Sequence, residues 1–270
     1  MRKDYNSDPA GSQWQEIKTF FDTQRHRQHD LRRDILDGLL YLVKTGCRAR
    51  GYPSQRMLPG GFAMQKFLQW QTVYYYFRKW KRQELLGYLL SAARRKARKE
   101  AGREAEPSAL IIDCQSVPIT RSGGLSGFDG HKRGKGRKRH IAVDTQGWTW
   151  AADVHAANEH ESQRALKLLE KADQKSDRLE IVFADKAYRG DLEDELEEKL
   201  GLRLEITESE SDEPGFSVEP KRWIVERTLG WLLGWLGGWR RLSKEYERLA
   251  ETSAAMVRLA SLQLALNRLH

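Results

Sequence analysis

Three acidic residues stand where predicted strands or helices begin or end. Asp113 closes a short apolar strand predicted over 109–113, Asp185 follows the apolar run LEIVFA at 179–184, and Glu226 lies near the start of a predicted helix. If the first and fourth strands are neighbours, both aspartates emerge at one end of a sheet, where open α/β folds usually bind ligands. Carboxylates bind Mg²⁺, and two such ions about 3.5–4 Å apart suit phosphodiester chemistry.

The same three residues also have a structural explanation. An aspartate after a strand is a common N-cap or turn residue, and a chain with 38 acidic residues produces triples by chance. Other acids are predicted to be structural: Asp144 in a hairpin turn, Glu159 and Glu161 at a helix N-terminus, and residues 193–198 on an exposed face.

The helix predicted over 222–239 divides into two faces at about 100° per residue. Its apolar arc includes three tryptophans spaced four residues apart and ending at Trp239, which we expect in the core. Three glycines share the other arc with Glu226. Each costs roughly 1 kcal/mol relative to alanine, which indicates close approach by a DNA backbone, a second chain or another helix. Trp223 either stacks on an exposed base or packs against the core.

A glycine-rich, basic segment lies between Gly123 and His140 (GGLSGFDGHKRGKGRKRH). We expect a flexible loop that leads into the second strand. Its positive charge, beside a candidate phosphodiester site, suits contact with DNA phosphates, and a merely solvated loop is the alternative. The expected phosphate contacts are Lys132, Arg133, Lys135, Arg137, Lys138 and Arg139.

Other ligand-binding motifs have little support. The sequence contains no G-x-x-x-x-G-K-[ST] P-loop, so ATP-driven chemistry is not indicated. His155 and His160 are too few for a metal cluster, and we interpret them as structural or as phosphate contacts. Cys47 and Cys114 are too few for a zinc site and are interpreted as reduced thiols.

Strands and helices alternate in the second half of the chain. The predicted strands are 109–113, 139–143, 149–155, 179–184 and 202–206, and the predicted helices are 159–172, 191–200, 222–239 and 251–269. The second and third strands are joined at a hairpin turn signal over 144–147. Three antiparallel strands followed by alternating helices and strands indicate an α/β fold with a mixed five-stranded sheet and flanking helices. This order matches the ribonuclease H fold.

The first hundred residues predict a small all-α unit. An amphipathic segment surrounds Trp14, a helix over 31–45 ends at the C-cap Gly46, and residues 54–61 form a loop. A second helix runs from about Gln65 through Trp80, and a third ends near Lys99. The second helix is aromatic, with Arg78 and Lys79 among its polar positions. A helix-turn-helix DNA-binding unit and a plain bundle with an aromatic core fit this pattern equally.

The net charge of the chain favours a nucleic-acid partner. The formal charge is +9 and the pI about 9.5, a balance that suits polyanions. The N-terminus lacks the apolar core of a signal peptide, and no apolar run reaches the roughly 20 residues of a membrane span. We therefore expect a soluble, cytoplasmic protein.

Several linked motifs resemble the IS5 group (IS4/IS5 superfamily) of bacterial insertion-sequence transposases. They are DLRRDILDGLLYLVKTGC and TVYYYFRKW in the first hundred residues, IDCQSV around Asp113, GFDGHKRGKGRKRH, VDTQG, VHAANEHES, FADKAYRG around Asp185, and RWIVERT with RRLSKEYE around Glu226. The resemblance implies an RNase H-like domain and a Mg²⁺-dependent (or Mn²⁺-dependent) DDE site made by Asp113, Asp185 and Glu226. It also implies transposition through cuts at terminal inverted repeats.

The chain departs from the wider family pattern Y-x2-R-x3-E-x6-K. Arg222 and Glu226 fit it, whereas Glu219 stands at the Tyr position and Leu233 at the Lys position. We expect Arg222 to contact DNA as the pattern implies. The DNA contact of the missing lysine is expected to fall to other cations of the same region: Arg227, Arg240 or Arg241.

The sequence thus predicts a helical DNA-binding region over 1–100, a linker over 101–108 and a catalytic domain over 109–270. The predicted function is cleavage and joining of insertion-sequence DNA by a protein associated with the bacterial nucleoid. Because two DNA ends must be brought together, the resemblance also implies at least a homodimer. The alternatives are a nuclease of the same fold that does not join DNA, and a sequence-specific DNA-binding relic without catalysis.

Overall fold

The computed structural model describes residues 7–21, 31–47, 55–57, 64–66, 68–120, 123–130, 132–207, 223 and 238–269, with the backbone alone at 55–57 and 64–66. The N-terminal elements are α1 (Gly11–Ile17), η1 (Lys18–Phe20), α2 (Leu31–Thr45), β1 (Gln55–Met57), β2 (Met64–Lys66), α3 (Trp70–Arg82) and α4 (Leu85–Glu100). The remaining elements are β3 (Ala109–Pro118), β4 (Gly127–Asp129), β5 (Gly134–Asp144), β6 (Thr149–Ala156), α5 (Glu161–Asp173), β7 (Ile181–Ala184), η3 (Lys186–Tyr188), α6 (Leu192–Leu200), β8 (Arg203–Ile206), η4 (Arg240–Leu242) and α8 (Ala250–Leu266).

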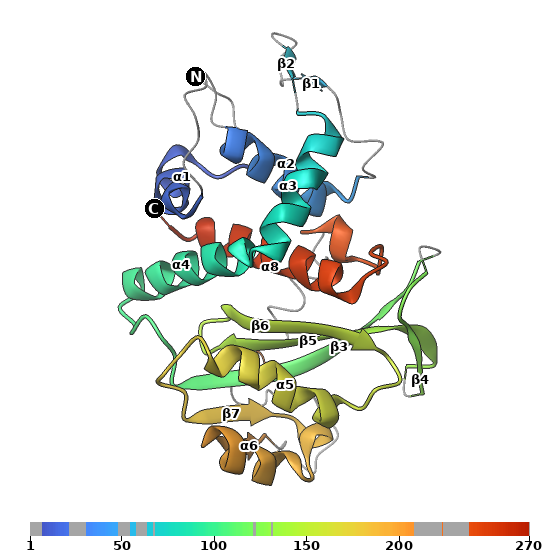
Figure 1. Ribbon diagram of the computed structural model, residues 1–270. Coiled ribbons are helices and arrows are strands. Elements are labelled where there is room, and N and C mark those ends of the chain that lie inside the picture. The colour runs from blue at the N-terminus through green and yellow to red at the C-terminus, as the bar shows by residue number, and fades with distance from the viewer. Residues whose placement is uncertain are drawn as a thin grey trace.

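The central sheet is mixed, as the sequence predicts. Its hydrogen-bonded order is β4-β5-β3-β7-β8, and β6 pairs with β5 as well. The pairs β3–β5 and β5–β6 are antiparallel, whereas β3–β7 and β7–β8 are parallel. With helices on its two faces, this arrangement confirms the predicted ribonuclease H-like fold (Figure 1).

Alternation along β3 sends successive side chains to opposite faces of the sheet. Leu110 and Ile112 join the buried cluster under α5 and α6, whereas Ile111 joins a second cluster under α8. Each fully buried leucine or isoleucine contributes roughly 1.5–3 kcal/mol. Both faces of the sheet are therefore covered by apolar packing.

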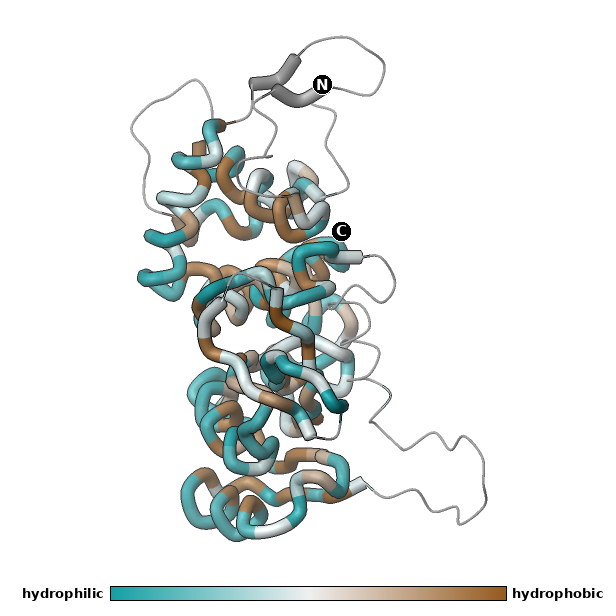
Figure 2. Tube along the Cα trace, turned by 90° about the vertical axis from the view of Figure 1, so that its right-hand side faces the viewer, coloured by the Kyte–Doolittle hydropathy of each residue, from teal (hydrophilic) through white to brown (hydrophobic). Residues whose placement is uncertain are grey.

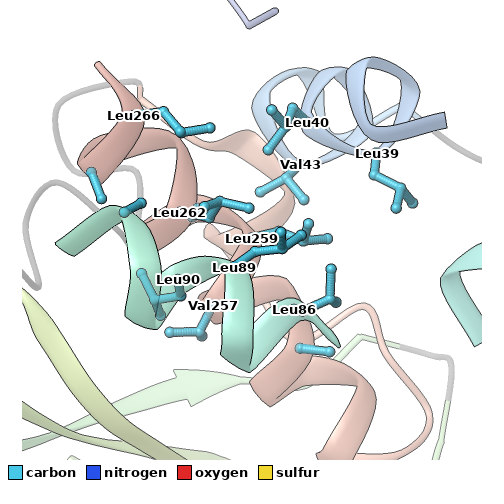
Figure 3. Packing of buried hydrophobic residues seen from close by; sticks show 14 of the residues in the cluster. Leu39, Leu40, Val43, Leu86, Leu89, Leu90, Val257, Leu259, Leu262 and Leu266 are labelled. Atoms are coloured by element: carbon cyan, nitrogen blue, oxygen red, sulfur yellow. The ribbon is translucent and has the colours of Figure 1, made fainter. Parts of the chain in front are cut away.

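Helix α8 joins the N-terminal helices to the sheet. It packs on β6 and also contacts α2 and α4; α4 lies beside it above the sheet, and α2 lies further from the sheet (Figure 1). Its leucines meet Leu40 of α2 and Leu89 of α4 in one continuous cluster (Figure 3). Hydropathy along the chain trace shows the same arrangement, with the apolar stretches gathered where the helices face one another (Figure 2). None of the helices within the described ranges is long and apolar enough to cross a membrane.

Helix α4 is anchored on the β5–β6 hairpin by two buried arginines. Arg98 Nη1 donates to Asp144 Oδ2 at 2.6 Å, and the Arg94 guanidinium lies 3.7 Å from the centroid of the Trp150 ring. Asp144 also accepts hydrogen bonds from the backbone of Gln146 and Trp148. The predicted hairpin turn is confirmed, and its aspartate is also the anchor of α4.

The predicted linker packs against the sheet-bearing part of the chain. Glu106 accepts a hydrogen bond from Arg95 at 2.7 Å, and its carbonyl oxygen accepts one from Arg178 at 3.0 Å. The Ser176 hydroxyl donates to the Pro107 carbonyl. The division into domains at 101–108 stays a prediction.

Several predicted element boundaries are wrong. The helix expected from about Gln65 begins at Trp70, because 64–66 form strand β2, which pairs with β1 in the expected loop. The segment expected as a flexible loop before the second strand contains β4 and the first part of β5, which pair through residues 127–129 and 134–136. Strand β3 continues to Pro118, so Asp113 lies within it rather than at its end. The helix expected over 222–239 lies almost entirely outside the described residues, and Trp239, at its predicted end, is buried but not helical.

Candidate active site

Asp113 and Asp185 lie at the same level of two adjacent parallel strands. The parallel register pairs Leu110 with Val182 and Ile111 with Phe183. Asp113 follows Ile111 by two residues, and Asp185 follows Phe183 by two residues. Asp185 is the first residue after β7. Because neighbouring strands lie about 4.8 Å apart, the register brings these two carboxyl-bearing residues together at the carboxyl end of β7.

The two aspartates also belong to the same face of the sheet. Ile111 and Phe183 both point into the cluster under α8. Asp113, two residues beyond Ile111, shares its face, and the backbone at Asp185 is still extended at φ −82° and ψ 175°. Both residues are half-buried. The sheet thus presents two carboxylates side by side, as the sequence predicts when the first and fourth strands are neighbours.

Backbone amides orient each carboxylate. Asp113 Oδ1 accepts a hydrogen bond from the amide of Cys114 at 2.6 Å, and Asp185 Oδ1 accepts one from the amide of Ala187 at 3.0 Å. Asp185 is therefore the N-cap of η3, the structural role considered in the sequence. Because capping uses only one of the two carboxylate oxygen atoms, the same side chain can also bind a metal ion.

The third acidic residue of the predicted site, Glu226, lies outside the described residues, as do Arg222 and Arg227. Trp223 is described and is 48% exposed. It contributes to the lining of a pocket between the ends of α4 and α8 and the β5–β6 turn. Its predicted contact with a nucleic-acid base stays a prediction.

The basic segment splits into an exposed group and a buried group. Lys132, Arg133 and Lys135 are exposed on the turn between β4 and β5 and at the start of β5. This turn projects beyond Pro118, which pairs with Gly136, so it lies toward the same end of the sheet as the aspartates. These three cations are the part of the segment that the structure leaves accessible to a DNA backbone.

Arg137 and Arg139 are buried instead, with exposed fractions of 0% and 1%. Both bind the buried carboxylate of Glu245: Arg137 Nη1 donates to Oε2 at 3.2 Å, and Arg139 Nε donates to Oε1 at 2.6 Å. Their remaining donors reach backbone carbonyls, among them that of Leu242. Their guanidinium groups hold the segment 242–248 against the sheet and are not at the protein surface.

Lys138 points to the other face of the sheet, where it is 9% exposed and lies 3.1 Å from a carboxylate oxygen of Glu161. Near the C-terminus, Arg240 is exposed, whereas the Arg241 guanidinium pairs with Glu247 at 2.6 Å. Of these three cations, Arg240 is therefore the one that remains accessible to a ligand.

Helix α3 separates its aromatic residues between two faces. Val73, Phe77 and Trp80 are buried, whereas Tyr74 and Tyr75 are 50% and 61% exposed. The predicted DNA contact Arg78 is exposed on the outer side and Lys79 is half-buried. The helix therefore has an aromatic core face, as a plain bundle requires, and an outer face of tyrosines and cations, whose contact with DNA stays a prediction.

Sequence reasoning missed a buried group of Cys114, His140 and His155, which come from three adjacent strands. One potential ligand atom from each residue lies within 4.8 Å of the others. Because these side chains are brought together by strand pairing, their sequence spacing carries no ligand motif. His160, by contrast, is exposed and bonds Ser162 at the start of α5.

A ribonuclease H-like sheet with two carboxylates at one level, one within β3 and one directly after β7, is the arrangement expected of a metal-dependent nucleic-acid enzyme. Comparison with known proteins agrees with this class. Residues 104–262 match the family described as transposase DDE domain, and residues 11–90 match a family described as putative transposase of the IS4/5 family. Since the first match covers more than half of the 270 residues, the chain belongs to the DDE transposase family of the IS4/5 type.

A curated relative extends this finding. A putative transposase for insertion sequence element IS402 from Burkholderia cepacia is 28% identical over 141 residues. The alignment covers 50% of this chain and 64% of that relative, which is slightly less than two thirds of its length.

Proposed function

We propose that this chain is a DNA transposase that binds the terminal inverted repeats of its insertion sequence and catalyses metal-dependent strand cleavage and strand transfer. The observation that carries the proposal is the in-register pair Asp113 and Asp185 on adjacent parallel strands. Membership of the DDE transposase family supports it.

The chemistry of the donor set fits a divalent metal. Two carboxylates at one level of a sheet offer the hard oxygen ligands that Mg²⁺ and Mn²⁺ prefer, and Glu226 is proposed to complete the set. When bound, these ions supply Lewis-acid activation of the nucleophile and charge stabilisation at the leaving oxygen. The amides of Cys114 and Ala187 each bond one carboxylate oxygen and so restrict the orientation of the two aspartates, which supports the proposed site.

Positive side chains around this edge of the sheet are proposed to position DNA. Lys132, Arg133 and Lys135 project beyond the same end of the sheet and can pair with phosphates as a strand crosses the site. Arg240, with Arg222 and Arg227 in the preceding segment, is proposed to contact the same DNA, and Trp223 to stack on an unpaired base.

The outer face of α3 is proposed to read the inverted repeat. Its exposed Tyr74, Tyr75 and Arg78 stand on a helix whose other face is packed in the core. A helix anchored in this way can enter the major groove of a duplex. Lys79, beside them, is proposed as a phosphate contact.

The proposed reaction has two displacement steps. Water first attacks the phosphodiester at the end of the element and releases a 3′-hydroxyl group. That hydroxyl then attacks a phosphodiester of target DNA, so that the strand is joined as another 3′-oxygen leaves. Because two element ends take part, the active species is proposed to contain at least two copies of the chain.

The test is a labelled duplex that carries an inverted repeat found in the DNA beside the gene, incubated with protein and Mg²⁺ or Mn²⁺. Asp185→Asn is the matched variant, because an asparagine oxygen still caps η3, and Asp194→Asn on the exposed face of α6 is the control. We expect cleavage at the repeat end with the wild type and the control, none with Asp185→Asn, and joined products with target DNA. Cleavage without joining identifies a nuclease, and repeat binding without cleavage under either metal identifies a DNA-binding relic.

A further inference from the structure

Cys114, His140 and His155 meet on the face of the sheet that α5 covers. Cys114 on β3 lies directly opposite His140 on β5, and His155 comes from β6 on the far side of β5. Their exposed fractions are 8%, 0% and 0%. Alternation along β3 puts Cys114 on the opposite face from its neighbour Asp113, so this group is separate from the carboxylate site.

Each histidine has one nitrogen held by a neighbour. His155 Nδ1 lies 3.1 Å from the Ala156 carbonyl oxygen. Because a carbonyl can only accept, Nδ1 carries the proton and Nε2 keeps its lone pair. His140 Nε2 lies 2.8 Å from the Tyr188 hydroxyl group.

The other nitrogen of each ring has no hydrogen-bond partner in the part of the chain that the structure describes: His155 Nε2 and His140 Nδ1 are both buried. Leaving such a polar atom buried and unpaired is unfavourable. One nitrogen held by an outer hydrogen bond and the other left open is the arrangement of metal-ligating histidines.

The protonation states of the two histidines suit a metal as well. Burial lowers the pKa of His140 to about 3 and also lowers the pKa of His155, so both rings are neutral at physiological pH. Neutral imidazole is the form that binds metal. Burial raises the pKa of the Cys114 thiol, which opposes thiolate formation, so loss of this proton to solvent must be driven by the metal ion itself.

We propose that Cys114, His140 and His155 bind one Zn²⁺ ion at a site distinct from the DDE carboxylates. One thiolate and two imidazoles match the sulfur and nitrogen ligands that Zn²⁺ prefers, whereas Mg²⁺ prefers oxygen. Zn–N bonds of about 2.0–2.1 Å and Zn–S bonds of about 2.3 Å place tetrahedral ligands about 3.5 Å apart. In the structure the three ligand atoms lie within 4.8 Å of one another, so Zn²⁺ binding draws these side chains closer together.

A Zn²⁺ ion held here links the three strands β3, β5 and β6 directly behind Asp113. Its fourth ligand is a water molecule, because the Tyr188 hydroxyl group is the hydrogen-bond partner of His140 Nε2, on the other side of the ring from Nδ1. The site does not depend on the proposed transposition reaction. Binding can therefore be tested on protein whose DNA activity is unknown.

The experiment is metal substitution in full-length protein stripped with a chelator and then supplied with Zn²⁺ or Co²⁺ in excess Mg²⁺. We expect one Zn²⁺ per chain, and with Co²⁺ a near-ultraviolet thiolate-to-metal charge-transfer absorption. Cys47→Ala is the matched control, since Cys47 is the other free cysteine and stands outside the group. It is expected to keep both signals, whereas Cys114→Ala and His155→Gln lose them.

Zn²⁺ should also raise the Tm of the wild type and of Cys47→Ala but not of Cys114→Ala, because a ligand stabilises only the state that binds it. If Cys114→Ala does not fold, the Co²⁺ absorption spectra of His155→Gln and Cys47→Ala still decide whether the three residues bind the metal. Folded wild-type protein without the thiolate–Co²⁺ absorption overturns the proposal. So does loss of that absorption in Cys47→Ala.

Discussion

Arg139 and Glu245 form a buried ion pair that links the centre of the sheet to a segment more than a hundred residues further along the chain. Arg139 Nε donates to Glu245 Oε1 at 2.6 Å, and the Glu245 side chain is 0% exposed. Arg137 binds the other carboxylate oxygen, and the Ser253 hydroxyl at the start of α8 donates to the same group. One carboxylate thus joins β5, the segment 242–248 and α8.

Replacing Glu245 should therefore be strongly destabilising. Glu245→Ala leaves two arginines buried without their counter-ion, and breaking a buried pair in this way costs about 3–5 kcal/mol. Glu195→Ala is the comparison, because Glu195 forms an exposed pair with Lys199 on α6, and such pairs contribute about 0–1 kcal/mol. Urea unfolding of both variants measures the difference. Equal losses of stability would contradict the assigned role of Glu245.

Asp113→Asn should abolish metal-dependent cleavage and leave DNA binding intact. The asparagine keeps an oxygen that can accept from the Cys114 amide, so the local fold is retained while the negative charge is lost. Outer-shell changes already reduce metal affinity or activity by about 10–100-fold, and we expect a larger loss from a direct ligand. Cleavage rates and repeat affinity are measured on the same preparation. Retained cleavage at the wild-type rate would remove Asp113 from the proposed site.

The exposed lysines of the β4–β5 turn should control the salt dependence of DNA binding. Each phosphate contact contributes about −0.9 to the slope of log K against log salt. The double variant Lys132→Ala and Lys135→Ala is therefore expected to reduce the slope by about 2 and to weaken binding to all DNA sequences alike. Lys199→Ala on α6, which pairs with Glu195, is the control. An unchanged slope in the double variant would place these lysines outside the DNA interface.

The position of the paired aspartates and the mixed sheet followed from local signals. Helix α2 occupies the predicted residues 31–45, because its apolar residues recur at helical spacing and Gly46 ends it at φ +66°. Each aspartate follows an apolar run, so the sequence predicts that Asp113 and Asp185 meet if the first and fourth strands are neighbours. What the sequence did not contain was the parallel register, which places them at the same level.

The buried arginines show what sequence reasoning missed. Arg137, Arg139, Ile141 and Val143 occupy every second position along the chain. If the strand is extended back to residue 134, all four side chains therefore fall on the same face of the sheet. The glycines and charges of the segment instead favoured a loop. The partner that makes burial tolerable, Glu245, is 106 residues from Arg139, and no local pattern reveals such a pair. The same reason hid the meeting of Cys114 with the two histidines.

Lys175 should make stability depend on pH in the alkaline range. Burial lowers its pKa to about 7, and its ammonium donates to the Trp150 carbonyl at 2.8 Å. In the unfolded chain the pKa is about 10.4, so between pH 7 and 10 the unfolded state binds more protons and stability rises with pH. Lys175→Met removes this contribution. Urea unfolding at pH 7.5 and 9.5 should show a larger gain with pH in the wild type than in the variant, and equal gains would contradict the lowered pKa.

Arg78 should distinguish repeat recognition from general DNA binding. It stands on the exposed face of α3, beside Tyr74 and Tyr75, while Phe77 and Trp80 hold the helix in the core. A side chain that reads a base contributes about 1–3 kcal/mol of discrimination, so Arg78→Ala is expected to weaken repeat binding by about 5- to 150-fold and binding to unrelated duplex much less. Lys99→Ala, an exposed cation on α4, is the control and should change neither. Equal weakening on both duplexes would make Arg78 a phosphate contact, and no change on either would move the recognition surface away from α3.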